Sequence, residues 1–512
     1  MAAFNSKIIA TNTLMLYVRM LFLMAVTLYT SRVVLDKLGV LDYGIYNAVA
    51  GVVGMLGFLN GTLSTGTSRF LTFELGAGNK ERLQTTFSTA FFTHLGLALV
   101  IAILLESVGV WFIHNKLIIP PDRMASAIWC FHISILTTVI AITQVPYTAV
   151  IIAHENMKIY AYVGIVEALA NLGVAYLLTI ATVDKLILYA SLLAAIKISI
   201  SLFYRFYCNR KYWESKLRKI FNKPIFKQLL GFSGWSLIAN IAEVLSHQGY
   251  VLLINMFFSP VVVAAQSIGN QISGAIMAFV GNFRTAINPQ IIKLYAAKEY
   301  AASRQLTLSS TVYVFDLLLL LGLPLIVLMK PILNVWLVEV PEYAVVFGQY
   351  IVARNILGCF GSSFYTPMVA SGELRHNSYA AVYVSLFAFI ALYFILKLGG
   401  GVMWVQYMGL ITTLVFSFLI KPIILHKRIA YPTNELLRCM LQCLKIAVIP
   451  IVVSALIYIY ISIDSLVKII LAAGVIAFSV GLSAWIFLDK QMKTKIIRII
   501  KKKLSKHINN RK

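Results

Sequence analysis

The chain has 512 residues, of which 60% are hydrophobic and only 12% are charged, and its mean hydropathy is +0.84. This composition is typical of a polytopic membrane protein and excludes a chain of soluble domains, because no soluble fold buries so many apolar runs of about 20 residues. Forty-four lysines and arginines oppose 19 acidic residues, which gives a formal net charge of +25. That charge is typical of a nucleic-acid-binding protein unless membrane orientation explains it.

The apolar runs predict fourteen membrane-spanning helices when the chain is cut at prolines, glycines and charged clusters. In chain order they cover 12–35, 43–67, 85–110, 124–148, 158–181, 184–206, 228–256, 260–283, 305–329, 343–370, 377–397, 401–425, 437–462 and 465–488. The first has no cleavage site of small residues, so we interpret it as a retained span and not as a signal peptide. The sequence therefore predicts an all-α polytopic membrane protein.

The positive charges lie mostly in alternate loops. Eight lysines and arginines fall within 205–227, and ten more follow from Lys490 onward. An even number of spans places both termini on one side of the membrane, and the positive-inside rule makes that side cytoplasmic. The excess of lysine and arginine over acidic residues then reflects membrane orientation, and we expect no nucleic-acid partner.

The chain contains a weak internal duplication. Residues 146–178 resemble 364–396, and the segment around Arg82 resembles the segment around Arg304. Both offsets are about 220 residues, which predicts parallel repeats. We expect an N-terminal six-helix lobe, a C-terminal six-helix lobe, two additional helices and a basic cytoplasmic tail, covering 1–220, 221–430, 431–488 and 489–512. The tail either lies on the anionic inner leaflet or only fixes the topology.

The loops are too short to contain a soluble catalytic domain, and the sequence has no Walker loop, GxSxG or HExxH motif. The five cysteines are scattered without metal-ligand spacing, so we interpret them as reduced packing residues. These observations favour transport over enzymatic chemistry.

Eight ionisable residues fall inside the predicted spans. They are Arg19, Arg32, Lys197, Arg354, Glu106, Glu167, Glu243 and Asp316. Each costs roughly 2.5–3.5 kcal/mol in hydrocarbon, so each is expected to face a partner or a wet cavity. Both interpretations stay open for every member of the set. Arg32 and Glu106 lie near the outer edge, where a structural pair or a side chain reaching the interface is favoured.

Polar residues also line one face of the seventh and eighth spans. On the seventh they are Ser236, Asn240, Glu243, His247 and Tyr250; on the eighth they are Gln266, Asn270 and Ser273, followed by Asn282 and Arg284. Residues three or four apart share a helix face. Such a stripe must face protein or water, and hydrogen bonding between helices without any cavity is the alternative.

Several stretches of the chain resemble one family. They are residues 28–76, KLIIPPDRM (116–124), VPYTAVIIAHENM (145–157) and NPQIIKLYA (288–296). They are similar to the Wzx-type lipopolysaccharide or capsule flippases of the polysaccharide transporter family. That family lies in the MOP superfamily, with the MATE exporters and the lipid II flippase MurJ.

The resemblance implies two six-helix lobes, alternating access, and movement of an undecaprenyl-pyrophosphate-linked oligosaccharide to the periplasmic leaflet of a bacterial inner membrane. Arg19, Arg284 and Arg354 are the candidates for the anionic head, because a guanidinium binds phosphate bidentately. Asn240, Gln266, Asn270 and Asn282 are the candidates for binding sugar hydroxyls. Glu243 with His247 is the candidate coupling pair, with a proton or sodium ion as the coupled ion and no cofactor.

Three alternatives remain at this point. A MATE-like cation or drug exporter is expected to have a cavity dominated by carboxylates, unlike the equal mixture of cations and anions found here. A membrane glycan polymerase or ligase is disfavoured by the short external loops. A lipid-scaffolding role without transport is the third. For a flippase, membrane lipid and the glycan polymerase and chain-length proteins are the expected partners.

Overall fold

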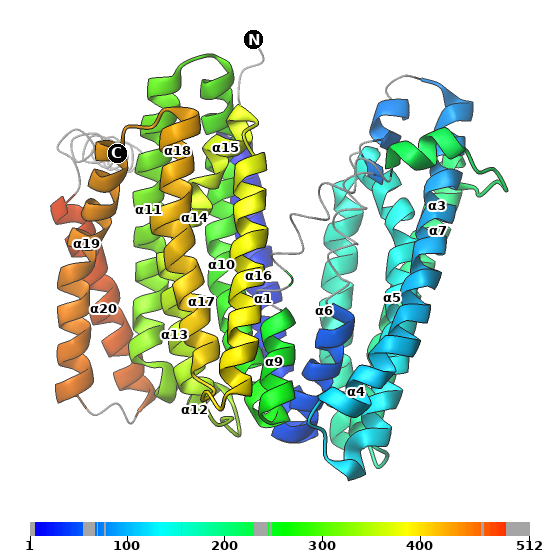
Figure 1. Ribbon diagram of the computed structural model, residues 1–512, viewed down its shortest axis with the longest axis horizontal. Helices are drawn as coiled ribbons and strands as arrows, with labels where there is room; N and C mark the ends of the chain where they lie inside the picture. The colour runs from blue at the N-terminus through cyan, green and yellow to red at the C-terminus, as the bar shows by residue number, and fades with distance from the viewer. Residues whose placement is uncertain are drawn as a thin grey trace, which may run out of the picture. The chain divides into compact units, whose positions relative to one another are not determined.

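The computed structural model describes residues 6–54, 67–68, 70–75, 78–154, 156–229, 244, 248–461 and 465–487. Side chains of the first helix are described from Met20 onward. Every regular element in these ranges is a helix, which confirms the all-α prediction (Figure 1).

The structure describes the following helices in chain order. They are α1 (Ser6–Gly54), α3 (Lys80–Leu104), α4 (Val110–Lys116), α5 (Met124–Ala153), α6 (Met157–Ile180), α7 (Lys185–Lys211), α9 (Tyr250–Phe257), α10 (Pro260–Ala296), α11 (Tyr300–Val327), α12 (Met329–Trp336), α13 (Ala344–Leu357), α14 (Cys359–Ser363), α15 (Tyr365–Ser371), α16 (Arg375–Lys397), α17 (Trp404–Leu414), α18 (Lys421–Ile429), α19 (Thr433–Tyr460) and α20 (Leu466–Phe487). Short π-helical segments join α3 to α4 and α17 to α18.

Ten helical stretches of the described residues are long and apolar enough to cross a membrane, and a bent pair, Ala344–Leu357 with Cys359–Ser371, makes an eleventh. These stretches coincide with eleven of the predicted spans. The other three predicted spans, 12–35, 43–67 and 228–256, include residues whose backbone or side chains lie outside the described part of the chain. The protein is therefore a multi-pass membrane protein.

Gly39 interrupts α1 at the predicted boundary between the first two spans. Its φ of 78° and ψ of 164° lie in a region that glycine adopts without a steric penalty. Beyond this kink, α1 approaches the start of α10 at Gly44. A Cβ atom on Gly44 would lie 1.9 Å from the carbonyl oxygen of Pro260, so the two backbones meet only because the side chain is absent.

The chain divides into two compact units. The first comprises Met1–Gln271, Trp336–Phe347 and Ser378–Thr412. Within it, α5 packs against α3 and α7, and α6 packs against α1 and α7 (Figure 1). Phe131 and Ile142 of α5 are fully buried in an apolar core of this unit.

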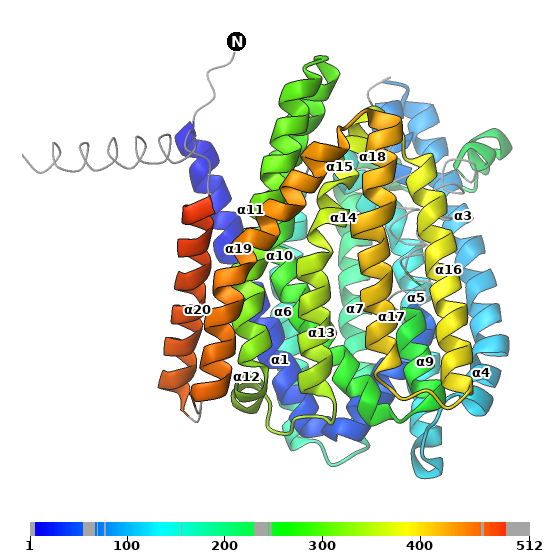
Figure 2. The same ribbon diagram turned by 60° about the vertical axis from the view of Figure 1, so that its left-hand side comes forward.

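The second unit comprises Ile272–Val335, Gly348–Asn377 and Thr413–Lys512. Here α11 packs against α14, α19 and α20 (Figure 2). Phe315 of α11 and Phe364 both contact Phe360, with ring centroids 5.9 and 6.2 Å apart. All five cysteines of the chain are buried and free, as predicted. The lobe boundaries at 220 and 430 stay a prediction.

An ionic cluster ties three helices of the first unit together. Arg123, just before α5, donates to Asp42 of α1 from Nε (2.8 Å) and Nη2 (2.6 Å), and to Asp184 from Nη1 (2.9 Å). Ser126 donates to the same Asp184 carboxylate at 2.8 Å. Asp184 also caps α7, because it accepts the backbone N–H groups of Leu186 and Ile187.

The protonation of Asp184 follows from these contacts. Partial burial alone would raise the pKa of this carboxyl, but Ser126, the Ile187 N–H and Arg123 outweigh burial and hold the pKa below its usual value. The carboxylate is therefore charged at neutral pH. It holds the start of α5 against the start of α7, and so fixes two of the helices that line the pocket described next.

Candidate functional site

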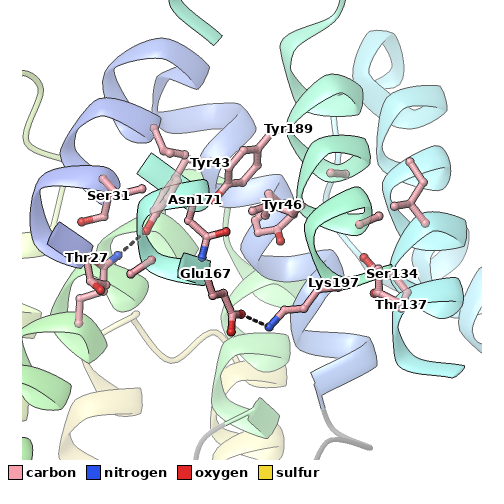
Figure 3. A pocket seen from close by; sticks show the side chains of 18 residues that line it. Thr27, Ser31, Tyr43, Tyr46, Ser134, Thr137, Glu167, Asn171, Tyr189 and Lys197 are labelled. Carbon is pink, nitrogen blue, oxygen red and sulfur yellow. Dashed lines mark hydrogen bonds and ion pairs between the residues drawn. The ribbon is translucent and has the colours of Figure 1, made fainter. Parts of the chain in front are cut away.

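A pocket of about 370 Å³ lies within the first unit (Figure 3). Helices α1, α5, α6 and α7 supply most of its wall, and Gln271 of α10 completes it. Its volume falls within the range of small-molecule binding sites. Because four apolar helices surround it, the pocket places polar groups inside the predicted membrane region.

Hydroxyl groups dominate the polar lining. They belong to Thr27, Thr30, Ser31, Tyr43, Tyr46, Ser134, Thr137 and Tyr189. Thr27, Thr30 and Ser31 recur at three- and four-residue spacing, which puts them on one face of α1. Tyr46 and Tyr189 make an edge-to-face contact with centroids 4.9 Å apart. The wall thus offers hydrogen-bonding groups beside aromatic surface.

One ion pair lies in the same wall. Glu167 of α6 and Lys197 of α7 point toward one another, and Lys197 Nζ donates to Glu167 Oε1 (Figure 3). Their side chains are 29% and 57% exposed. Charges in hydrocarbon are costly, and here the two side chains neutralise one another. The pair gives the pocket wall an exposed polar patch that water or a polar ligand can contact.

Two further polar atoms of the lining have no hydrogen-bond partner among the described residues. They are Thr30 Oγ1 and Gln271 Oε1, both buried. The Nε2 of Gln271 donates to the hydroxyl of Tyr43. An unsatisfied buried polar atom costs about 1–3 kcal/mol, and a ligand rich in hydroxyl groups offers partners to both. The described residues contain no group of three or more His, Cys, Asp or Glu side chains placed to hold a metal ion.

The eighth-span residues predicted to bind sugar lie outside this pocket. Gln406 Nε2 of α17 donates to Gln266 Oε1 at 2.6 Å, and Gln266 Nε2 donates to Asn270 Oδ1 at 3.2 Å. Gln266 is buried. Ser273 accepts a hydrogen bond from Asn355 at 2.7 Å. The contacts from Gln406 and Asn355 join helices, which is the alternative that the sequence left open, whereas the Gln266–Asn270 contact lies within α10. A role in sugar binding stays a prediction.

The predicted arginines are differently placed. Arg284 belongs to the second unit, where its Nη2 donates to the hydroxyls of Ser362 and Ser363 while its buried Nε has no partner among the described residues. Arg354 lies near the end of α13. The side chains of Arg19 and Asn282 lie outside the described residues.

The predicted coupling pair also lies outside the described part of the chain. The structure does not describe Glu243, His247 or the neighbouring Asn240, so their roles stay predictions. Glu106, in contrast, pairs with Nδ1 of His132 at 3.0 Å, in agreement with a structural role for this carboxylate.

Glu167 and Lys197 were predicted to be intramembrane ions, but their sequence positions assigned them to no site. The two residues are 30 positions apart and lie on different helices. The sequence does not show which faces of these two helices contact one another, so it does not predict the pair. The hydroxyl wall was missed altogether, since serine, threonine and tyrosine are common in apolar spans. The three- and four-residue spacing of Thr27, Thr30 and Ser31 was the available signal.

The sequence model of the MatE family matches residues 13–177, which is less than half of the chain. No curated protein sequence matches the chain. Among solved structures, the lipid II flippase MurJ in an inward closed conformation is similar with a TM-score of 0.69 and 13% identity, covering 93% of this chain and 98% of that one.

Two MATE structures share the same architecture. An inward-facing multidrug resistance MATE family transporter of the MOP superfamily has a TM-score of 0.61 and 13% identity, covering 81% of this chain and 95% of that one. A MATE protein in complex with MaL6 has a TM-score of 0.56 and 12% identity, covering 83% and 96%. The chain therefore has the MurJ and MATE fold.

Proposed function

We propose that the protein is a flippase for a lipid-linked oligosaccharide, working by alternating access in a bacterial inner membrane with both termini in the cytoplasm. The observation that carries the proposal is the hydroxyl-lined pocket with its exposed Glu167–Lys197 pair, set among membrane-spanning helices of a transporter fold. A saturated sugar presents hydroxyl groups and C–H faces, which match the polar and aromatic parts of this wall.

The ion pair suits a polar or anionic glycan better than a free cation. Lys197 provides a cation and Glu167 a hydrogen-bond acceptor, so the pair can open toward a ligand that replaces both contacts. Arg19, Arg284 and Arg354 remain our candidates for the diphosphate head. Glu243 with His247 remains the candidate for proton or sodium coupling. In this proposal the protein catalyses no covalent chemistry, and glycan polymerase and chain-length proteins are its expected partners.

A MATE-like exporter of organic cations is the second candidate, and the match of the MatE family model to residues 13–177 favours it. A cation exporter needs carboxylates that are available to its substrate. The carboxylate of this pocket is paired with a lysine instead. The pocket chemistry therefore supports the flippase over the exporter.

The experiment exchanges the two charges of the pocket. Purified protein is reconstituted into liposomes with a fluorescent undecaprenyl-diphosphate-linked disaccharide, and its appearance in the other leaflet is followed. Lys197→Glu and Glu167→Lys each place two like charges together, so each is expected to reduce flipping at least tenfold. The double exchange should restore a large part of the rate, because it rebuilds the pair in the opposite orientation.

Lys397→Glu at the end of α16 is the matched control, since it makes the same charge change outside the pocket. Unchanged flipping by both single variants at normal folded yield would refute the role of the pocket. Efflux of an organic cation such as ethidium by the wild type, without movement of the lipid probe, would favour the exporter.

A further inference from the structure

The segment that follows α7 carries an unusual surface, which we call the basic loop (residues 212–229). Its exposed charged side chains are all positive: Lys216, Arg218, Lys219, Lys223 and Lys227. The single acidic residue of this range, Glu214, is buried and paired with Nε2 of His154 at 2.5 Å. The outward face of the loop is therefore uniformly cationic.

Large apolar side chains are exposed between these cations. Trp213, Leu217, Ile220 and Phe221 are between 39% and 47% exposed. A soluble surface does not normally interleave four such residues with five cations over so short a stretch. The combination is typical of a segment that lies at the interface of an anionic bilayer, where the apolar groups enter the acyl boundary and the cations meet headgroups.

The backbone of the basic loop is held in place on α3. Gln84 Nε2 donates to the carbonyl oxygen of Lys216 at 3.0 Å, and the N–H groups of Arg218 and Asn222 donate to the hydroxyls of Ser88 and Thr89 at 3.2 and 3.1 Å. Figures 1 and 2 show the basic loop as the green segment on the right, beside the beginning of α3.

Side chains complete this anchoring. Ile225 and Leu229 are buried against Ala90 of α3, and the ring of Tyr212 stacks on His154 with centroids 4.3 Å apart. The backbone is thus fixed by its inward contacts. The exposed apolar residues are therefore a preformed outward surface and not the inner face of a poorly packed loop.

The position of the basic loop relative to the membrane follows from the chain. Helix α7 (Lys185–Lys211) is long and apolar enough to cross a membrane, and the basic loop begins at the next residue. Its cations therefore follow the end of a membrane-spanning helix, 5 to 16 residues after Lys211, on the face that charge distribution predicts to be cytoplasmic. A negative surface potential attracts cations on that leaflet.

We propose that the basic loop is a binding site for anionic phospholipid headgroups of the inner leaflet. The five cations bind headgroup phosphates, and Trp213, Leu217, Ile220 and Phe221 enter the acyl boundary. A protein partner is disfavoured, because the surface already lies at the edge of the bilayer. This site is separate from the pocket of α1, α5, α6 and α7 and does not depend on the proposed function.

The depth of the basic loop is tested with spin labels in the full-length protein. Because the native cysteines are all buried, Leu217→Cys and Phe221→Cys can be labelled selectively, and Glu299→Cys before α11 provides an exposed control. In nanodiscs containing phosphatidylglycerol, labels at 217 and 221 should be relaxed by oxygen and protected from nickel-EDDA, with the reverse at 299. Equal accessibility to nickel-EDDA at all three positions would overturn the proposal and point to a protein partner.

Lipid selectivity is tested by native mass spectrometry of the detergent-solubilised protein with added phosphatidylglycerol or phosphatidylcholine. The triple variant Lys216→Gln, Arg218→Gln, Lys219→Gln should bind phosphatidylglycerol about 100-fold more weakly at low ionic strength, since each cation near an anionic surface contributes roughly fivefold. Phosphatidylcholine binding should change little.

The matched control removes three cations of the face that the topology predicts to be outside, by Lys116→Gln, Lys330→Gln and Lys397→Gln. It should bind phosphatidylglycerol as the wild type does. An unchanged affinity in the basic-loop variant, or an equal loss in the control, would overturn the proposal.

Discussion

Replacing Arg123 tests whether the ionic cluster of Arg123, Asp42 and Asp184 stabilises the helices around the pocket. Arg123→Met keeps most of the apolar stem of the side chain and removes the guanidinium. Asp42 then loses the contacts from Nε and Nη2, and Asp184 loses the contact from Nη1. Two carboxylates are left facing one another without their cation.

The expected loss of stability follows from the exposure of the cluster. Exposed ion pairs contribute about 0–1 kcal/mol, whereas removing one partner of a buried pair costs about 3–5 kcal/mol. The side chains of Arg123, Asp42 and Asp184 are only 16–29% exposed, so the cluster is closer to the buried case. We expect Arg123→Met to lower the free energy of unfolding by about 2–4 kcal/mol.

Reversible unfolding in mixed micelles of increasing dodecyl sulfate content measures this difference. Lys37→Met is the matched control, because Lys37 pairs with its neighbour Asp36 and is more exposed than Arg123. This substitution should lower the free energy of unfolding by less than about 1 kcal/mol. Arg123→Lys should be intermediate, since it keeps the charge without the bidentate geometry. Equal stability of Arg123→Met and wild type would show that the cluster does not hold α1, α5 and α7 together.

The same cluster predicts a dependence on pH. Because the folded-state pKa of Asp184 lies below its unfolded value, its contribution to stability is present at neutral pH and is lost as the pH falls through the folded-state pKa. The difference in the free energy of unfolding between wild type and Asp184→Asn should therefore be constant above about pH 5 and shrink below about pH 4. A difference that instead disappears on raising the pH from 5 to 8 would contradict this assignment.

Three further outcomes are expected. Gly44→Ala should destabilise the protein by about 1–3 kcal/mol, because the new Cβ overlaps the start of α10, whereas Gly96→Ala, with no neighbouring atom within 4 Å, should be neutral or stabilising in the same unfolding assay. An impermeant thiol reagent should label a cysteine at position 116 but not at 211 in intact cells, and labelling at 211 would reverse the predicted topology. Glu243→Gln should stop flipping while substrate binding persists, and a variant that flips with its usual response to a pH gradient would exclude the coupling role.

The sequence alone was enough to predict the eleven spans that the described residues contain. An apolar run such as 377–397 has no stable position except across the hydrocarbon, and the helix is the structure that satisfies its backbone there. The break between the first two predicted spans was also encoded locally, because glycine at position 39 tolerates the backbone angles of the kink. These properties depend on neighbouring residues, so a single sequence is enough to predict them.

Only the tertiary structure decided which polar groups meet. Gln266, a candidate for sugar binding, accepts a hydrogen bond from Gln406, 140 residues away, while Lys197 meets Glu167 in the pocket wall. Helical periodicity assigns residues to a common face but does not say which helix packs against that face. The pocket exists because hydroxyls from α1 and α5 converge with this ion pair, and that convergence is a property of helix packing and not of any one span.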